Sequence, residues 1–345
     1  MYNWEDLTEV VTGRKPTMFL RDIAENIEHI RKYKRALFIG GAGTIGLATI
    51  KEFMRHGCLE HIGIVDQDEN AMAEAIRSVR NRSKSISLDV HVSDISEARF
   101  QVDLDDYDIV LWFAAMKHVR SERDARSCKR MLGINHSYVF GHQSPRFFYC
   151  STDKAADPAN LLGASKRIGE AMALKNGGNA ARFANVAFSS GSLLQSWLYR
   201  MAEGQPLPVP KDIYRYLISP AEAGRICLLA ATWKMHGVLL VPIMRELTLL
   251  THACQRFIDH FGHHGGMDVT DPDTSGEKYA EKFSGKDEQV RTAGHEMNRV
   301  TPKDNVDTDM TYGYCASKEE IIAAVARAVP NFGHSETGKS LDGRA

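Results

Sequence analysis

The stretch Ala36-Leu37-Phe38-Ile39-Gly40-Gly41-Ala42-Gly43-Thr44-Ile45-Gly46 decides the fold. A short apolar run ends at glycines, and a helical pattern follows over residues 45–56. The three glycines of the Gly-x-x-Gly-x-x-Gly spacing permit a tight turn between strand and helix, where backbone amides and the positive helix end meet a pyrophosphate. The residues expected to bind a dinucleotide cofactor here are Gly40, Gly43, Thr44, Ile45 and Gly46.

The next predicted strand, residues 61–66, ends in an acid. Asp66 follows Gly46 by 20 positions, where a carboxylate accepts hydrogen bonds from the adenosine ribose. A negative charge there repels a ribose 2′-phosphate. The sequence therefore predicts NAD as the cofactor, in preference to NADP.

Further apolar runs alternate with helical stretches, which is typical of βαβ units and a parallel sheet. The predicted strands cover residues 36–39, 61–66, 88–92, 108–113 and 147–151. We expect an α/β protein with a Rossmann-type doubly wound parallel sheet and a smaller C-terminal substrate-binding region. The predicted divisions are a helical extension (1–33), an NAD-binding domain (34–185), a substrate-binding region interleaved with the core (186–330) and a flexible tail (331–345).

Residues after the third and fourth strands are further cofactor candidates. Asp94 and Ile95 follow the third strand and are placed to contact the adenine, although a simple turn aspartate fits equally well. Ala114 and Ala115 follow the fourth strand and are small where the chain passes beside the cofactor. Beyond residue 185 the pattern loosens: we expect an extended segment at 204–210 and mostly loop over 262–312.

Composition excludes several classes of protein. The 43 basic and 44 acidic residues give a formal charge of −1, so no electrostatic footprint for nucleic acid or an anionic membrane exists. The six scattered cysteines read as reduced thiols. The N-terminus has no secretory signal, and no apolar run approaches the roughly 20 residues that cross a bilayer. We expect a cytoplasmic protein with no membrane or nucleic-acid partner.

A second block carries chemistry. Ser151-Thr152-Asp153-Lys154 follows the fifth strand, and Lys166 lies about ten residues further on, in a predicted helix. This is the layout of the short-chain dehydrogenase active site, in which a Tyr-x-x-x-Lys pair lies on one helical turn and the cation lowers the pKa of the phenol. The tyrosine position holds Leu162 here, whereas the lysine that binds the nicotinamide ribose is kept as Lys166.

These motifs together resemble the polysaccharide-biosynthesis (CapD-like) branch of the extended short-chain dehydrogenases. That branch includes the UDP-N-acetylglucosamine 4,6-dehydratases. The resemblance covers roughly residues 20–290. The blocks that carry it are Gly40–Gly46, Ala114–Val119, Ser151–Ala155, Gly163–Arg167, Arg182–Val186, Ser189–Ser192, Arg215–Tyr216 and Thr274–Lys278.

The resemblance implies a reaction in which NAD oxidises sugar C4, water leaves across C5 and C6, and hydride returns to C6. It implies Asp153 and Lys154 as the acid–base pair of the elimination, with Thr152 bonding the C4 oxygen; a surface turn pair is the alternative for Asp153 and Lys154. The resemblance also implies that Lys117 faces the cofactor cleft. The residues expected to bind the nucleotide-sugar are Lys117, His118, Asn185, Ser192, Arg215 (on the diphosphate) and Glu277 (near the ribose or base).

Some positions depart from that family. Leu162 replaces the tyrosine, as a methionine does in membrane-anchored members that are thought to use a water instead. Arg120 stands where the family usually has Pro, and Ala184 where it has Gly. Two other functions stay open: a nucleotide-sugar C4-epimerase or dehydrogenase, and a catalytically inactive NAD-binding regulatory subunit.

Two further readings concern side chains and assembly. A structural ion pair is an alternative role for Arg215, whose guanidinium could otherwise grip a phosphate. His260, His263 and His264 lack partner ligands at metal spacing, so we expect loop histidines and no metal site. The N-terminal extension and the family favour a homo-oligomer.

Overall fold

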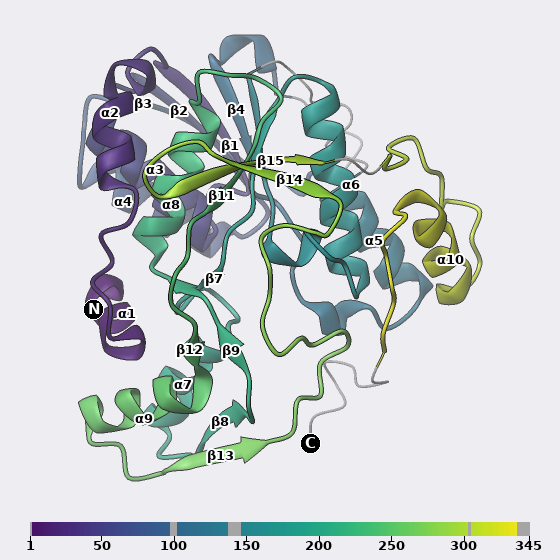
Figure 1. Cartoon of the computed structure of the whole chain (residues 1–345). Coiled ribbons are helices and arrows are strands. Elements are labelled where there is room, and N and C mark those ends of the chain that lie inside the picture. Colours follow the sequence, from purple (N-terminus) through teal and green to yellow (C-terminus); the bar gives the residue numbers. More distant parts are fainter. Residues whose placement is uncertain (1, 97–101, 137–145, 303–304, 337–345) are drawn as a thin grey trace.

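One large sheet organises the computed structural model, which describes residues 2–96, 102–136, 146–302 and 305–336. Its strand order is β14-β15-β11-β6-β5-β4-β1-β2-β3 (Figure 1). The strands from β11 to β3 pair in parallel, and β14 and β15 add an antiparallel hairpin at one edge. The strands are β1 (Arg35–Ile39), β2 (His61–Asp66), β3 (Ser87–Val92), β4 (Ile109–Trp112), β5 (Phe147–Cys150), β6 (Asn179–Ala181), β11 (Leu239–Pro242), β14 (Glu288–Thr292) and β15 (Met297–Pro302). The predicted doubly wound parallel sheet is confirmed.

Helices cover both faces of this sheet (Figure 1). Helices α2, α3, α4 and α8 lie on one face. Their apolar residues share a core with the side chains that β1, β2, β4 and β5 direct to that face. The opposite face packs on α6, and α5 and α10 lie against α6. The bounds are α2 (Leu20–Ile30), α3 (Thr44–His56), α4 (Glu69–Arg80), α5 (Ala125–Asn135), α6 (Leu161–Lys175), α8 (Pro220–Ala231) and α10 (Lys318–Ala328).

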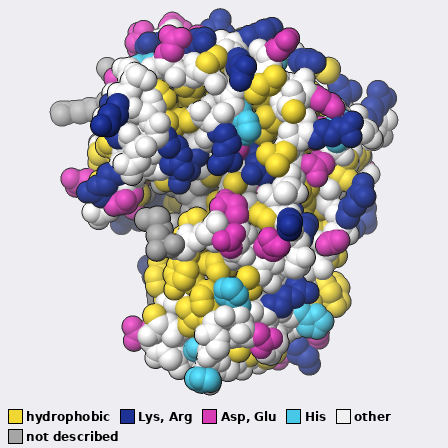
Figure 2. Space-filling model, turned by 90° about the vertical axis from the view of Figure 1, so that its left-hand side faces the viewer, with side chains coloured by type: hydrophobic (Ala, Val, Ile, Leu, Met, Phe, Trp, Pro, Cys, Tyr) yellow, Lys and Arg dark blue, Asp and Glu magenta, His cyan; other side chains and the backbone are white. Residues whose placement is uncertain are grey.

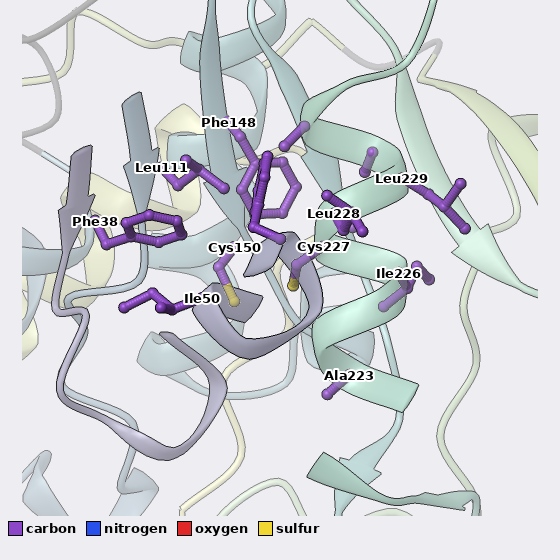
Figure 3. Close-up of a cluster of buried hydrophobic side chains, with 14 of the residues drawn as sticks. Phe38, Ile50, Leu111, Phe148, Cys150, Ala223, Ile226, Cys227, Leu228 and Leu229 are labelled. Carbon is purple, nitrogen blue, oxygen red and sulfur yellow. The ribbon is translucent and has the colours of Figure 1, made fainter. Parts of the chain in front are cut away.

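The core under α8 shows how this packing is made (Figure 3). Phe38, Leu111 and Phe148 extend from three adjacent strands toward α8. Burying each such side chain stabilises the fold by about 1.5–3 kcal/mol. Cys150 and Cys227 lie in this core, and all six cysteines, which fall within the described ranges, are unpaired.

A smaller region lies below the carboxyl ends of the strands (Figure 1). It contains three two-stranded ladders, β7–β10, β8–β13 and β9–β12. Helix α1 packs on α9 in this region, around Leu7, Trp197 and Phe257. Its elements are α1 (Trp4–Thr12), β7 (Asn185–Val186), α7 (Leu193–Ala202), β8 (Leu207–Pro210), β9 (Tyr214–Arg215), β10 (Leu217–Ile218), β12 (Thr248–Leu249), α9 (Leu250–Phe261) and β13 (Met267–Thr270).

The structure refines two expectations. Residues 262–312 are mostly loop, as expected, but the short strands β13, β14 and β15 also lie there. The helical extension consists of two helices that serve different regions: α1 belongs to the core of the smaller region and α2 packs on α8. The extended segment expected at 204–210 contains β8.

The surface and the helices add two observations. On the face that Figure 2 shows, basic and acidic side chains are interspersed, with hydrophobic side chains gathered in the lower part. Within the described ranges, no helix combines the length and the apolar character that a membrane crossing requires.

The end of the described chain returns to the loop before α6. The backbone N–H of Gly333 donates to the Pro158 carbonyl at 3.1 Å, and that of Ser335 donates to the Ala159 carbonyl at 3.0 Å. The flexible tail predicted from residue 331 lies partly outside the described residues, since 337–345 are not among them. The predicted division boundaries stay predictions.

Four buried charges connect α6, β6 and β14. Arg182, at the end of β6, forms paired hydrogen bonds to the Glu170 carboxylate at 2.7 Å each and also bonds Glu288 at 2.6 and 2.9 Å. Arg167 contacts both carboxylates. All four side chains are at most 2% exposed. The two guanidiniums stabilise the charged carboxylates. Burial by itself would raise the pKa of Glu288, but Arg182 and Arg167 outweigh burial, so this pKa lies below its ordinary value.

Replacing Arg182 by Met should destabilise the protein by about 3–5 kcal/mol, because it leaves two buried carboxylates with one guanidinium. Urea unfolding followed by circular dichroism measures this loss. The control is Arg291→Met, which removes an exposed arginine of β14. A loss below about 1 kcal/mol for Arg182→Met would contradict this account.

Candidate active site

The glycine turn joins β1 to α3 and depends on a close backbone approach. Gly40 has φ of 77°, and a Cβ on it would lie 2.4 Å from the Ala114 backbone nitrogen. The N–H groups of Phe113 and Ala114 both donate to the Ile39 carbonyl, which brings the chain after β4 against the turn. Only glycine fits at position 40, and Ala114 lies beside the turn where the sequence placed it.

Gly43 is the N-cap of α3 and faces open space. A Cβ on Gly43 would meet only the Gly40 carbonyl oxygen, at 3.4 Å. The N–H groups of Thr44, Ile45 and Gly46 open the helix and have no intrahelical acceptors. Free amides, the positive helix end and an open approach together fit a pyrophosphate.

Asp66 lies at the end of β2, directly beside this turn. Its Oδ2 accepts a hydrogen bond from the Ala42 N–H at 3.1 Å, and its Oδ1 accepts one from the Asp68 N–H at 3.2 Å. Burial raises the pKa of the Asp66 carboxyl above its ordinary value. The carboxylate therefore lies where an adenosine ribose would follow a pyrophosphate held at α3.

The other predicted cofactor positions lie at the neighbouring strand ends. Asp94 follows β3, accepts from the Ser96 N–H at 2.9 Å and pairs with Arg130 at 3.2 Å. Ile95 is half-buried and packs on the core of the α6 face. Ala115 follows Ala114 and is half-buried.

Lys117 and His118 connect the chain after β4 to the loop after β7. The Lys117 ammonium donates to the Ser190 carbonyl, and the Thr44 hydroxyl accepts from the Ser190 N–H at 3.1 Å. The His118 ring lies against Gly191. Both residues are exposed, yet partial desolvation by the surrounding chain lowers the pKa of Lys117, and desolvation together with the Lys117 charge lowers that of His118. The cofactor turn and the substrate region thus meet at these side chains.

The Thr152–Asp153–Lys154 block forms a 3-10 turn just beyond β5. The Thr152 hydroxyl donates to Asp153 Oδ1 at 2.8 Å, and the Lys154 ammonium donates to the same oxygen at 3.2 Å. Asp153 is 3% exposed and the Lys154 side chain 24%. The Thr152 hydroxyl and the accessible Lys154 ammonium therefore both donate to one oxygen of a buried carboxylate, which argues against the surface-turn alternative.

Glu281 completes this cluster, and the sequence reasoning missed it. Its Oε1 lies 3.6 Å from the Lys154 nitrogen, and its Oε2 is buried without a hydrogen-bond partner in the described chain. Burial disfavours the charged form of Lys154, yet Asp153 and Glu281 outweigh it, so the pKa of Lys154 is raised. The sequence offered only its position, three residues beyond the Thr274–Lys278 block already expected at the site.

Helix α6 positions the remaining predicted catalytic residues. Leu162, in the tyrosine position, is 5% exposed, and its N–H donates to the buried carboxylate of Glu122 at 3.0 Å. Lys166 lies one turn further and donates to the Cys150 carbonyl at 2.9 Å, with its ammonium 4.7 Å from the centre of the Tyr149 ring. Burial lowers the pKa of Lys166.

The structure joins two predicted substrate-binding residues to each other. The Arg215 guanidinium, 5% exposed, contacts the Glu277 carboxylate and donates to the Lys278 carbonyl at 3.0 Å. This is the ion pair that the sequence left as an alternative for Arg215. Ser192 caps α7 by accepting from the Gln195 N–H at 3.2 Å, and Asn185 lies in β7, half-buried.

The histidines at the end of α9 do not form a metal site in the described part of the chain. Among those residues, no group of three His, Cys, Asp or Glu side chains is placed to hold an ion. His263 instead faces the Gln205 carbonyl at 3.0 Å.

Paired substitutions in the glycine turn separate folding from cofactor binding. Gly40→Ala should cost at least about 2 kcal/mol of unfolding free energy, because the methyl group meets the Ala114 backbone at a positive φ. Gly43→Ala should cost less than about 1 kcal/mol but fill the approach to α3, so it should weaken NAD binding instead. Urea unfolding and calorimetric titration with NAD measure the two effects. Equal stability losses in the two variants would refute this reading.

Known proteins resemble the chain along most of its length. It is 24% identical over 258 residues to the uncharacterized membrane protein MJ1061 of Methanocaldococcus jannaschii, covering 69% of this chain and 76% of that protein. It is 29% identical over 248 residues to the inverting UDP-N-acetylglucosamine 4,6-dehydratase of Campylobacter jejuni, covering 66% and 72%. It is 26% identical over 231 residues to the UDP-glucose 4-epimerase of Rickettsia typhi, covering 60% and 65%.

Solved structures share the fold. Pen from Bacillus thuringiensis superposes with a TM-score of 0.67 at 19% identity, covering 78% of this chain and 88% of that one. DesIV, a dTDP-glucose 4,6-dehydratase from Streptomyces venezuelae solved with NAD, gives 0.59 at 16%, covering 73% and 88%. The model of a family described as polysaccharide biosynthesis protein matches residues 36–302. This chain belongs to that polysaccharide biosynthesis protein family.

Proposed function

We propose that the protein is an NAD-dependent nucleotide-sugar 4,6-dehydratase acting on a UDP-N-acetylglucosamine-like substrate. The observation that carries the proposal is the shared Asp153 oxygen, to which Thr152 and Lys154 both donate beyond the end of β5. An elimination needs an acid and a base within reach of neighbouring carbons, and this cluster supplies both. The dehydratase among the relatives supports the same class of reaction.

The residues around the glycine turn fit the NAD that such a reaction requires. The amides of Thr44 and Ile45 would hold the pyrophosphate, Asp66 the adenosine ribose and Lys166 the nicotinamide ribose. When bound, NAD takes hydride from sugar C4 and returns it to C6 within one turnover.

The chain's own groups would handle the protons. Thr152 would bond the C4 oxygen, and its existing hydrogen bond to Asp153 offers a path for the C4 hydroxyl proton. That path matters because the alkyl side chain of Leu162 accepts no proton. Asp153 and Lys154 would then serve as the acid–base pair. Asp153 would pass the C4 proton to the departing C6 hydroxyl, and Lys154, in its neutral form, would remove the C5 proton and return it to C5 when hydride reaches C6.

A C4-epimerase is the second candidate, favoured by the epimerase among the relatives. Hydride transfer alone normally relies on the tyrosine that Leu162 replaces. An epimerase also has no use for a carboxylate–ammonium pair such as Asp153 and Lys154. These two features favour the dehydratase.

We also propose that the active form is a homo-oligomer.

Incubation with UDP-N-acetylglucosamine and related donors, followed by mass spectrometry, tests the proposal. A dehydratase product lacks the mass of one water, whereas an epimerase product keeps its mass and changes its stereochemistry. If the substrate stays unchanged while NAD binds tightly, the protein is a catalytically inactive NAD-binding subunit and the proposal is wrong.

Asp153→Asn and Lys154→Ala should each lower turnover by at least about 100-fold, because each removes one partner of the acid–base pair. Both variants should retain NAD binding, measured by calorimetry. The matched controls are Asp287→Asn and Lys286→Ala, which alter an exposed adjacent pair. Full activity in either active-site variant would refute the assignment.

Glu281→Gln should shift the pH dependence of turnover. Asp153 and Glu281 hold the pKa of Lys154 above its ordinary value against burial, so removing the Glu281 charge lowers that pKa. Neutral Lys154, the form that would remove the C5 proton, then forms at lower pH, and the acidic limb of the pH–rate profile moves to lower pH. Glu203→Gln, at an exposed position, is the control. An unmoved acidic limb in Glu281→Gln would show that Glu281 does not act on Lys154.

A further inference from the structure

The loop after β4, residues 116–122, reaches two segments that carry expected substrate-binding residues. Asn135 fixes its start, because its side chain accepts from the Met116 N–H at 2.9 Å and donates to the Met116 carbonyl at 3.1 Å. Glu122 fixes its end through the bond from the Leu162 N–H. Arg120 extends from between these two anchors.

Arg120, which stands where the family usually has Pro, is largely buried. Its side chain is 12% exposed, and its Nη2 contacts the Asp273 carboxylate and lies 3.4 Å from the Thr274 hydroxyl. Its Nη1 is buried and has no hydrogen-bond partner within the described ranges. An unpaired buried donor on a charged group is costly, so this nitrogen favours a ligand that brings an acceptor.

Two guanidiniums bracket the same short turn. Arg120 contacts its first residues, Asp273 and Thr274, and Arg215 contacts Glu277 at its end. The turn is closed by the bond from the Glu277 N–H to the Thr274 carbonyl at 3.0 Å. A diphosphate offers the oxygen acceptors that guanidiniums bind best, and each arginine here is already oriented by a carboxylate.

We propose that Arg120 binds the phosphate groups of the nucleotide-sugar substrate, together with Arg215. This rests on the proposed function, since it takes a nucleoside diphosphate sugar as the substrate. Arg120 Nη1 donates to a phosphate oxygen, while Nη2 keeps its contact with Asp273. The arginine thus makes the site selective for a nucleoside diphosphate over the uncharged nucleoside.

Calorimetric titration of the NAD-loaded protein with UDP, and ligand-observed NMR with uridine, test this role. Arg120→Gln should weaken UDP binding by about 10- to 100-fold, the loss expected for one charged hydrogen bond, and leave uridine binding unchanged. Arg120→Lys should recover part of the UDP affinity, because it restores the charge without the planar fork. Arg123→Gln, at a side chain that is 59% exposed just after this loop, should bind UDP as the wild type does.

Three results would overturn the proposal. If Arg120→Gln binds UDP with wild-type affinity, Arg120 makes no contact with a phosphate. Equal weakening of UDP and uridine would assign Arg120 a merely structural role in holding the turn. A wild-type protein that binds neither UDP nor dTDP would exclude the nucleotide altogether. Failure of the dehydratase is distinguishable, because substrate then stays unconverted while UDP binding still depends on Arg120.

Discussion

The buried pairing of Arg182 and Arg167 with Glu170 and Glu288 is the constraint on which the rest depends. The four charges cancel, so their burial is tolerable only while all are in place. Glu170 lies one helical turn beyond Lys166 on α6, and it also accepts a hydrogen bond from Ser151, the residue before Thr152–Lys154. The network therefore fixes α6 and the end of β5 relative to each other, which sets the geometry of the site.

The nucleotide-binding half could be predicted from the sequence because its signals are local. An apolar run, a glycine turn and a terminal acid place β1, α3 and Asp66 with little help from the rest of the chain. The β14–β15 hairpin has no such signal. The side chains of β14 are exposed or half-buried because it is an edge strand, so Glu288–Thr292 reads as polar loop.

Parts of the site escaped prediction because they depend on tertiary contacts. The partner of a charged side chain is chosen by whichever segment folds beside it, and no spacing along the chain indicates that Arg215 meets Glu277 or that Glu281 meets Lys154. The sequence showed Arg120 as a departure from the family pattern, but only the folded structure shows that it is buried against Asp273. Leu162 was correctly placed because α6 keeps helical spacing from Lys166.

The bonds from Gly333 and Ser335 to the carbonyls of Pro158 and Ala159 have a consequence for biosynthesis. A ribosome makes the loop before α6 long before it makes the residues that close over that loop. Domains generally begin to fold during synthesis, from the N-terminal side. The nucleotide-binding half can thus acquire its sheet on the ribosome, while the loop beside Thr152–Lys154 waits for Gly333 and Ser335 to emerge. Closure of this loop then comes later than formation of the sheet as each new chain folds.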